Sequence, residues 1–303
     1  MREDAYSIFL MLTGNVCATL RYKVHSIDMP AGKALKFLKR RAAKDLTSSQ
    51  KCNLPALITH MEYNAQCRAG THMELFEPLF RKLRAGATPL MMITLVQDGA
   101  IKADASIPLD DTNLYLRPEF MDGYQMDDWL TKYRKGSSLD LPQLIHDDYY
   151  EAIKLTYNAG KLVSSMKLLL SCIDSLAYVE YGDDGNPFIA WLDMFADLPS
   201  LGITPQELWE LRNGLVHMTN LSSKKVRTNK VRQISFRVGA DGSYGRDGIY
   251  FFDFQKLIDV CSVAINGWIA SYNAEPSKFA KFIERYDQTI SDSRVATMSK
   301  AAP

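Results

Sequence analysis

The sequence of 303 residues predicts a mainly α-helical protein, with an N-terminal α+β domain followed by a C-terminal helical bundle. Apolar residues recur at helical spacing along most of the chain. This spacing gives way to short apolar runs between turn residues in two places, near 89–116 and near 233–252. A polar stretch with glycine and serine, 135–138, separates the two parts. We therefore expect domains at 1–137 and 138–290, and a disordered tail at 291–303.

In the N-terminal domain we expect four helices and a small antiparallel sheet. The helices are predicted at Ala5–Val24, Ala31–Asp45, Leu54–Gln66 and Met73–Arg84. The apolar segment of the first is about 16 residues long, too short for a membrane span. It also lacks the basic start of a signal peptide, so we interpret it as a buried helix. The strands are predicted at Pro89–Gln97, Ala100–Pro108 and Asn113–Leu116, with a turn at Asp98-Gly99 and a short helix following at Tyr124–Tyr133.

The C-terminal domain is expected to be a helical bundle with one β-hairpin insertion. The periodicity predicts helices at 143–158, 161–181, Pro187–Ala196, Pro205–Asn220 and Phe254–Tyr272. The first two are either one continuous helix or two helices broken at Asn158-Ala159-Gly160. The hairpin is predicted from Gln233–Val238 and Gly248–Phe252, which lie on either side of the turn residues Ala240-Asp241-Gly242.

Composition excludes several classes of protein. The 36 basic and 35 acidic residues leave a formal charge of +1, so any affinity for nucleic acid must come from local patches. Five cysteines, without a Cys-x-x-Cys pair, argue against a disulfide framework or a structural zinc site and favour buried thiols in the cytoplasm. Neither a metal-ligand spacing of histidines nor a glycine-rich phosphate loop is present. We expect no cofactor and no membrane association.

Candidate chemistry lies in the hexapeptide that runs from Arg212 to His217. Thr204-Pro205-Gln206-Glu207 has the form of a capping box, so the helix that carries the hexapeptide should begin at Pro205. At about 100° per residue, Arg212 and His217 lie about 140° apart on one lateral face, without stacking on each other. An arginine can bind a phosphate and a histidine can transfer a proton, which is what RNA cleavage through its own 2′-hydroxyl requires. Asn213 lies four residues before His217 and can either orient its ring or share the phosphate.

Two further features favour a functional site. The helix is followed by a segment with no acidic residue between Leu221 and Ala240, and we expect its basic residues to bind RNA phosphates: Lys224, Lys225, Arg227, Lys230 and Arg232. Asp174 lies in an otherwise apolar helix, where a buried carboxylate needs a partner, and Arg212 is a candidate. The alternative is that Asp174 faces solvent or bonds to Ser171.

The pattern Arg-Asn-x-x-x-His resembles the signature of the HEPN superfamily, helical-bundle domains of which many are metal-independent ribonucleases. The run 168–178 and the residues Trp209-Glu210-Leu211-Arg212 look like the second and third helices of such a domain, and the resemblance spans roughly 142–287. It implies an endoribonuclease that forms a homodimer, in which paired motifs line a composite cleft and leave a 2′,3′-cyclic phosphate. It also implies a toxin–antitoxin or antiviral role, with an antitoxin or regulatory protein as partner. The hairpin insertion departs from the simplest HEPN bundle.

The alternative is a non-catalytic module that binds RNA or protein, or that dimerises. In this interpretation Arg212 and His217 form a solvated or salt-bridged pair on the flank of a helix. Another basic group lies in the helix expected at Ala31–Asp45, formed by Lys33, Lys36, Lys39, Arg40, Arg41 and Lys44. We interpret it first as a solvated face, and a nucleic-acid or partner surface stays open.

Overall fold

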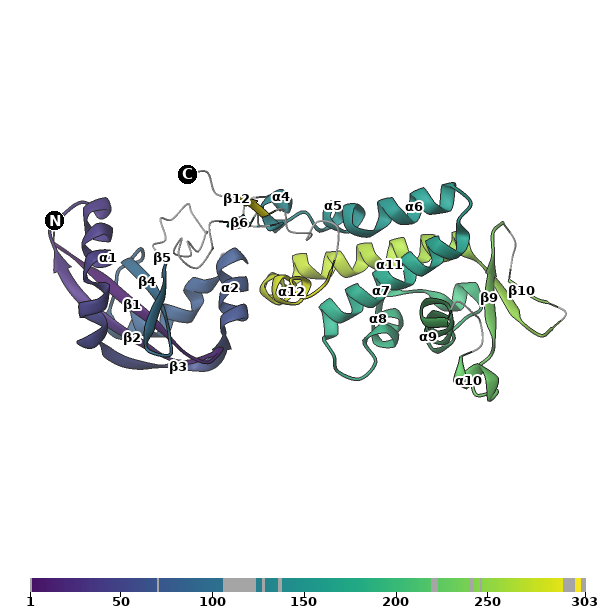
Figure 1. The fold of residues 1–303 in the computed structure, drawn as a ribbon, viewed down its shortest axis with the longest axis horizontal. Helices are drawn as coiled ribbons and strands as arrows, with labels where there is room; N and C mark the ends of the chain where they lie inside the picture. The colour runs from purple at the N-terminus through teal and green to yellow at the C-terminus, as the bar shows by residue number, and fades with distance from the viewer. Residues whose placement is uncertain are drawn as a thin grey trace. The chain divides into compact units, whose positions relative to one another are not determined.

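The computed structural model describes residues 2–69, 71–105, 124–126, 129–135, 138–218, 223–239, 242–245, 247–290 and 298–300 (Figure 1). The chain divides into two compact units, Met1–Leu130 with Ala296–Pro303 and Thr131–Val295. One unit is built on a five-stranded sheet and the other is largely helical. The chain is therefore a mixed α and β protein, and the mainly α prediction is corrected.

The first unit contains a sheet of strand order β3-β2-β1-β4-β5. Its strands are β1 (Glu3–Thr13), β2 (Val16–Ile27), β3 (Gln50–Thr59), β4 (Leu90–Gln97) and β5 (Ala100–Ala105). The pair β1 and β4 is parallel, and the other neighbours are antiparallel. The central position of β1 explains its apolar run, because both faces of a central strand can be covered.

The predicted helix Ala5–Val24 is wrong, because this segment forms the hairpin of β1 and β2. Gly14 and Asn15 make a two-residue turn, and Gly14 has a φ of 58°, which a type II′ hairpin turn requires at its first central position. A continuous apolar run fits a strand buried on both faces as well as a buried helix. Ile8 and Leu10 enter one hydrophobic cluster, while Ala5 and Phe9 enter the other.

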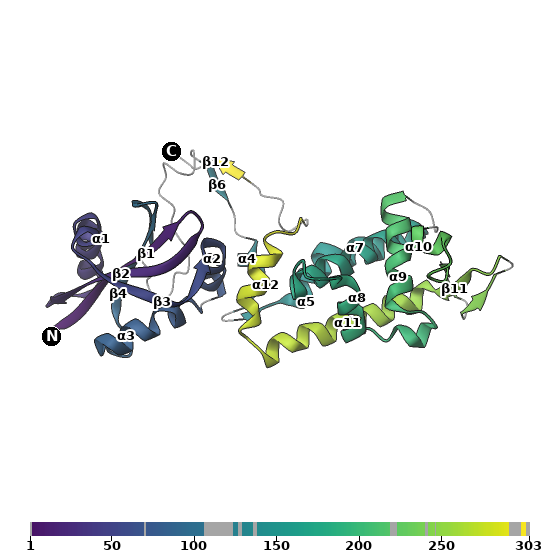
Figure 2. The same cartoon turned by 90° about the horizontal axis from the view of Figure 1, so that it is seen from below.

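Helices cover both faces of this sheet (Figure 2). On one face lies α1 (Ala31–Thr47), as predicted, whose Leu38 packs in the same cluster as Phe9. On the other lie α2 (His60–Ala69), the 3-10 helix η1 (His72–Phe76) and α3 (Glu77–Leu83). The predicted helix Leu54–Gln66 is thus wrong in its first half, which belongs to β3, and Met73–Arg84 is divided between η1 and α3.

The predictions at β4 and β5 are confirmed, with the expected turn between them. Asp98 and Gly99 have positive φ values of 50° and 83°. The two strands form one side of the larger mixed sheet and not a small separate sheet. The predicted strand Asn113–Leu116 lies outside the described residues.

The predicted helix Tyr124–Tyr133 is replaced by a strand, β6 (Tyr124–Met126), and a short helix, α4 (Leu130–Tyr133). The partner of β6 is β12 (Met298–Lys300), from the tail that we expected to be disordered; the rest of that tail lies outside the described residues. At the predicted linker, β7 (Arg134–Lys135) pairs with β8 (Ser138–Leu139).

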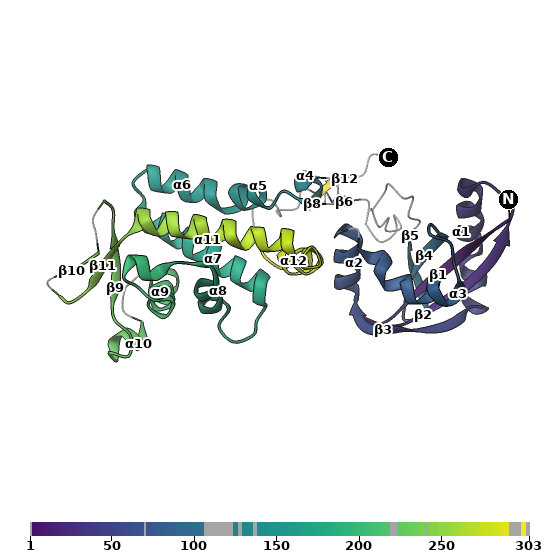
Figure 3. The same ribbon diagram turned by 180° about the vertical axis from the view of Figure 1, so that it is seen from behind.

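The second unit is a bundle of helices (Figures 1 and 3). It begins with α5 (Leu141–Ile145), a π-helical turn η3 (His146–Tyr150) and α6 (Glu151–Asn158), which together occupy the first predicted helix. Next come α7 (Leu162–Tyr181), α8 (Pro187–Phe195), the 3-10 turn η4 (Leu198–Leu201), α9 (Pro205–Arg212), the π-helical η5 (Asn213–Met218) and α10 (Lys224–Arg227). The unit closes with α11 (Phe254–Ala274) and α12 (Lys278–Tyr286). Gly160, at a φ of 71°, separates α6 from α7.

The expected hairpin has a different pairing. Its strands are β9 (Ile234–Arg237), β10 (Ser243–Tyr244) and β11 (Tyr250–Asp253). The antiparallel pair is β10 with β11, whereas β9 lies parallel to β11. The predicted hairpin between β9 and β11 is wrong because β10, too short to show a periodicity, occupies the antiparallel position.

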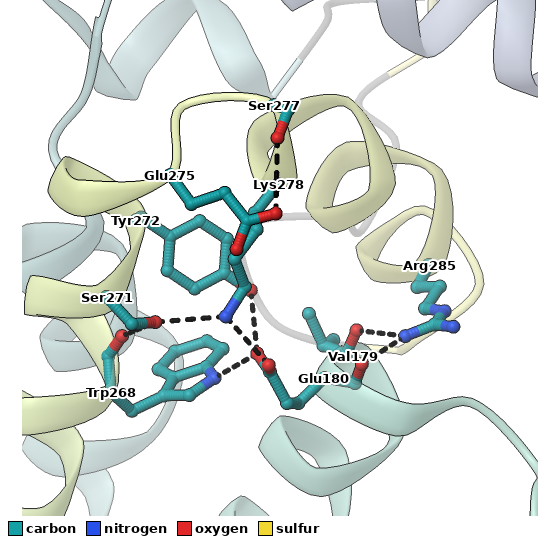
Figure 4. A network of polar contacts seen from close by, with 9 residues as sticks. All are labelled: Val179, Glu180, Trp268, Ser271, Tyr272, Glu275, Ser277, Lys278 and Arg285. Carbon is teal, nitrogen blue, oxygen red and sulfur yellow. Dashed lines mark hydrogen bonds and ion pairs between the residues drawn. The ribbon is translucent and has the colours of Figure 1, made fainter.

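Helix α12 was not predicted, and polar contacts fix it to the bundle (Figure 4). The Glu180 carboxylate at the end of α7 accepts hydrogen bonds from Trp268 Nε1 at 2.8 Å and from Lys278 Nζ at 2.7 Å. Arg285 donates to the carbonyl oxygens of Val179 and Glu180. One carboxylate and two carbonyl groups of α7 thus hold both α11 and α12.

Helix α7 is long and apolar enough to cross a membrane by length and composition alone. Half of its most apolar stretch is buried inside the unit, where α7 lies against α6, α8 and α12. The core helix of a globular bundle has the same properties.

We predict that His72 makes the first unit less stable in acid. His72 is buried, neither of its ring nitrogens has a hydrogen-bond partner among the described residues, and burial lowers its pKa below the usual 6.5. In acid, His72 therefore binds a proton more readily in the unfolded chain than in the folded unit. The free energy of unfolding consequently falls as the pH decreases below about 6.5. Hydrogen-exchange protection of the β1 and β4 amides, compared between about pH 7.5 and about pH 5.5, measures this loss.

The neutral variant His72→Gln should lose about 1 kcal/mol less than the wild type over this interval. His25 and His60 are present in both proteins, so their contributions cancel. Equal losses in the two proteins would show that His72 is not responsible.

Candidate functional site

Helix α9 begins as its sequence predicts. Thr204 Oγ1 accepts a hydrogen bond from the Glu207 amide at 3.2 Å, and the Glu207 carboxylate accepts one from the Thr204 amide at 2.8 Å. Pro205 occupies the first helical position. This capping box fixes where the helix starts and therefore the face on which its later residues lie.

The helix changes from α to π at the candidate motif. After Arg212, residues Asn213–Met218 are π-helical. A π-helix closes hydrogen bonds from i to i+5, so a residue five positions on lies one turn above, whereas in an α-helix it lies well to the side. The expectation that Arg212 and His217 do not stack is therefore wrong. Arg212 Nη1 lies 2.7 Å from His217 Nε2.

Asp174 of α7 holds the opposite edge of the guanidinium. Its Oδ2 accepts from Arg212 Nε and Nη2, both at 2.6 Å. Asp174 is therefore paired with Arg212, which is the first of the two interpretations that the sequence left open. Burial raises the pKa of Asp174 above its usual value, while the charge of Arg212 acts in the opposite direction. The pair is only partly exposed, at 26% and 18% of the side chains.

The donors of Arg212 determine the protonation of His217 in this arrangement. Arginine has no acceptor, so His217 Nε2 accepts the hydrogen bond from Nη1 and the ring is neutral with its proton on Nδ1. Nη1 also donates to Asn213 Oδ1 at 3.2 Å. The guanidinium lies over the ring of Trp209, 5.1 Å from its centroid. The Nη1 edge therefore faces two neutral groups, which an anionic ligand can replace, while the other edge stays with Asp174.

Two buried glutamates of α9 hold the basic segment that follows the motif. Glu210 accepts from Ser223 Oγ at 2.6 Å, and Ser223 caps α10. Lys225 Nζ lies 3.2 Å from Glu210. Glu207 accepts from Arg232 Nε at 2.7 Å. Glu210 was not among the predicted site residues, because at about 100° per residue it lies far from the face of Leu208 and Leu211, so the sequence pattern does not indicate its burial.

The five predicted RNA-binding residues fall into two groups. Arg232 is used within the unit: besides Glu207 it donates to the Gly202 carbonyl at 2.6 Å and to the Tyr244 hydroxyl at 3.0 Å. It also lies 4.4 Å from the Tyr250 ring centroid, so its guanidinium serves the fold. The others are at the surface, and three have no side-chain hydrogen bond or ion pair within the described part of the chain: Lys224, Arg227 and Lys230.

A second cluster of polar side chains lies in the first unit. Ser7 Oγ and His25 Nε2 contact the same oxygen of Asp45, at 3.0 and 2.7 Å. In a nucleophilic relay the serine would instead contact the histidine. The cluster therefore attaches α1 to the sheet. Among the described residues, no three His, Cys, Asp or Glu side chains are grouped so that they could hold a metal ion.

Comparison with protein-family models, with curated proteins and with solved structures found no match. The function is therefore inferred from the site geometry and from the motif.

We predict that Asp174 and Arg212 are energetically coupled. Each single change, Asp174→Ala or Arg212→Ala, leaves a partly buried charge without its partner, whereas the double change removes both. A double-mutant cycle should therefore give a coupling of about 1–3 kcal/mol. Urea unfolding followed by tryptophan fluorescence measures it, because Trp191, Trp209 and Trp268 lie in this unit. Additive single effects would mean that the pair does not stabilise the unit.

Proposed function

We propose that this chain is a metal-independent endoribonuclease whose catalytic residues are Arg212 and His217. The observation that carries the proposal is the 2.7 Å contact between Arg212 Nη1 and His217 Nε2, with Asp174 on the opposite edge of the guanidinium. A fixed cation and a neutral imidazole lie side by side at the surface of the helical unit. The resemblance of Arg-Asn-x-x-x-His to the HEPN signature supports the same function, and so does the helical surrounding of the motif.

In the proposed reaction the RNA supplies its own nucleophile. The scissile phosphate replaces His217 and Asn213 at Nη1 of Arg212, and the freed Nε2 lone pair accepts the proton of the ribose 2′-hydroxyl. The 2′-oxygen forms a bond to phosphorus as the bond to the 5′-oxygen breaks, leaving a 2′,3′-cyclic phosphate and a 5′-hydroxyl. Arg212 stabilises the charge that grows on the non-bridging oxygens. No cofactor takes part in these steps.

A second protonated group must supply the proton to the departing 5′-oxygen. One His217 cannot accept and donate a proton in the same step, so we propose a homodimer in which the two motifs face one composite cleft. The partner's copy of the motif then supplies the acid. Dimerisation of this kind is what the HEPN resemblance implies.

The basic segment would bind phosphates that flank the cleavage site. Lys224, Arg227 and Lys230 are exposed and suited to this, and Lys225 can exchange its contact with Glu210 for a phosphate. Arg232 would act indirectly, by holding the segment against α9 through Glu207. We place the protein in the cytoplasm, as a toxin or antiviral effector with an antitoxin or regulatory protein as partner.

A second candidate function is a non-catalytic binding or dimerisation module. It is favoured by the contacts of Arg212, most of whose donors already have partners within the chain: Asp174, Asn213 and His217. Such saturation is typical of a structural ion pair. Ribonuclease activity in chelator separates the two candidates, because a structural pair gives none.

We predict that His217→Ala lowers RNA cleavage in the presence of chelator by roughly 10²–10⁴-fold, because it removes general acid–base catalysis. His217 is exposed, so the fold should be unaffected. Cleavage of a labelled single-stranded RNA, with end-group analysis for the cyclic phosphate, measures the effect. The matched control is His146→Ala, which removes another exposed histidine of the same unit and should leave the rate unchanged. Full activity of the His217 variant would exclude the mechanism.

We also predict that Arg212→Lys cleaves RNA almost as slowly as Arg212→Ala. Lysine keeps the positive charge but loses the planar fork with which Arg212 binds Asp174 on one edge and a phosphate on the other. Single-turnover rates at saturating RNA make the comparison. Rates of the lysine variant near those of the wild type would show that a point charge is sufficient.

A further inference from the structure

Helix α1 presents a basic stripe to solvent that the proposed active site does not use. Lys33, Lys36, Arg40 and Lys44 are all exposed. At about 100° per residue these four positions fall within about 80° of one another around the helix. The stripe runs about 16 Å along the axis at about 1.5 Å per residue.

No acidic side chain of α1 neutralises this stripe. The opposite face of the helix is buried through Ala34, Leu38 and Ala42. The single acidic residue of the helix, Asp45, is fully buried and is bound by Ser7 and His25, with Arg41 Nε at 3.4 Å. Its charge is directed into the sheet, so the solvent side of α1 is positive only.

The sheet beside α1 adds further positive charges on the same face, among them Arg21 and Lys51. Arg21 of β2 and Lys51 of β3 are directly opposite each other in the strand register. Arg21 is also opposite Phe9, whose side chain packs in the cluster beneath α1. Directly opposed side chains point to the same face of a sheet, and like charges in such a pair destabilise it. Arg21 is half-buried and donates from Nη2 to the Ser49 carbonyl at 3.0 Å, whereas Lys51 is exposed.

We propose that the α1 basic surface, formed by Lys33, Lys36, Arg40, Lys44, Arg21 and Lys51, binds the phosphate backbone of a nucleic acid strand. A stripe of this length spans several phosphates, and a polyanion removes the repulsion between the opposed cations. The proposal rests on the first unit alone and not on the ribonuclease site.

The side chains of α1 favour nucleic acid over other acidic partners. Helices that bind an anionic membrane insert apolar side chains beside their charges, yet none of the exposed large apolar residues lies in α1. Protein interfaces are enriched in aromatic residues and methionine and depleted in lysine at their centre. The aromatic residue Phe37 is half-buried, against the ring of His25 at 5.3 Å.

The test measures binding of short single-stranded RNA and DNA to the full chain by fluorescence anisotropy over a range of salt concentrations. All proteins carry His217→Ala, so that the RNA stays intact whether or not the wild type cleaves it. The variant Lys33→Gln/Lys36→Gln/Arg40→Gln should bind about tenfold more weakly or worse. Its salt dependence should flatten by about 0.7 in log–log slope for each phosphate that the protein no longer binds.

A matched control removes three exposed basic residues at and beside α3, on the other face of the sheet: Arg81→Gln/Lys82→Gln/Arg84→Gln. It should retain the parental affinity and slope. Parental binding by the α1 variant, or an equal loss in the control, would overturn the proposal. Tighter binding of phosphatidylserine vesicles than of either nucleic acid would also overturn it, in favour of a membrane surface. Circular dichroism checks that each variant is folded. The single change Arg40→Glu should also weaken the binding of RNA and DNA.

Discussion

The ion pair between Asp174 and Arg212 is the contact on which the site depends. It joins α7 to the end of α9, at the residue where α9 changes into the π-helical turn. Without a partner, the long side chain of Arg212 can adopt many conformations. Because Nε and Nη2 both bind Asp174, the Nη1 edge of the guanidinium points in a fixed direction. The π-helical turn then brings His217 to that edge. The position of the Arg212 guanidinium therefore follows from one carboxylate.

Buried or half-buried carboxylates serve the same purpose elsewhere in the helical unit. Glu210 and Glu207 hold the start and the end of the basic segment against α9, and Glu180 joins α7 to α11 and α12. A buried charge is costly unless it is paired and hydrogen-bonded, so each of these acids specifies its partner strongly. Such contacts fix the positions of short helices and loops, which apolar packing alone specifies less strongly.

Among the described residues of the sheet unit, one acid, Asp45, is fully buried, and the unit uses it differently. Asp45 attaches α1 to β1 and β2 through Ser7 and His25, and by facing inward it leaves the outer side of the helix uniformly basic. The same residue thus contributes to the stability of the unit and to its surface charge. Two surfaces with positive charge, one in each unit, follow in a chain whose formal net charge is only +1.

Local features of the fold could be predicted from the residues alone: the capping box at Thr204, helix α1, the long helices α7 and α11, and the strands β4 and β5 with their turn. Each of these depends on neighbours within a few residues, whose pattern can be read directly. Long-range packing was needed to show that the first apolar segment is a hairpin, because a strand covered on both faces has the same apolar run as a buried helix. It was also needed for the contact of Arg212 with His217 and for the internal role of Arg232, since a π-helical turn and a buried glutamate partner leave no periodic signal.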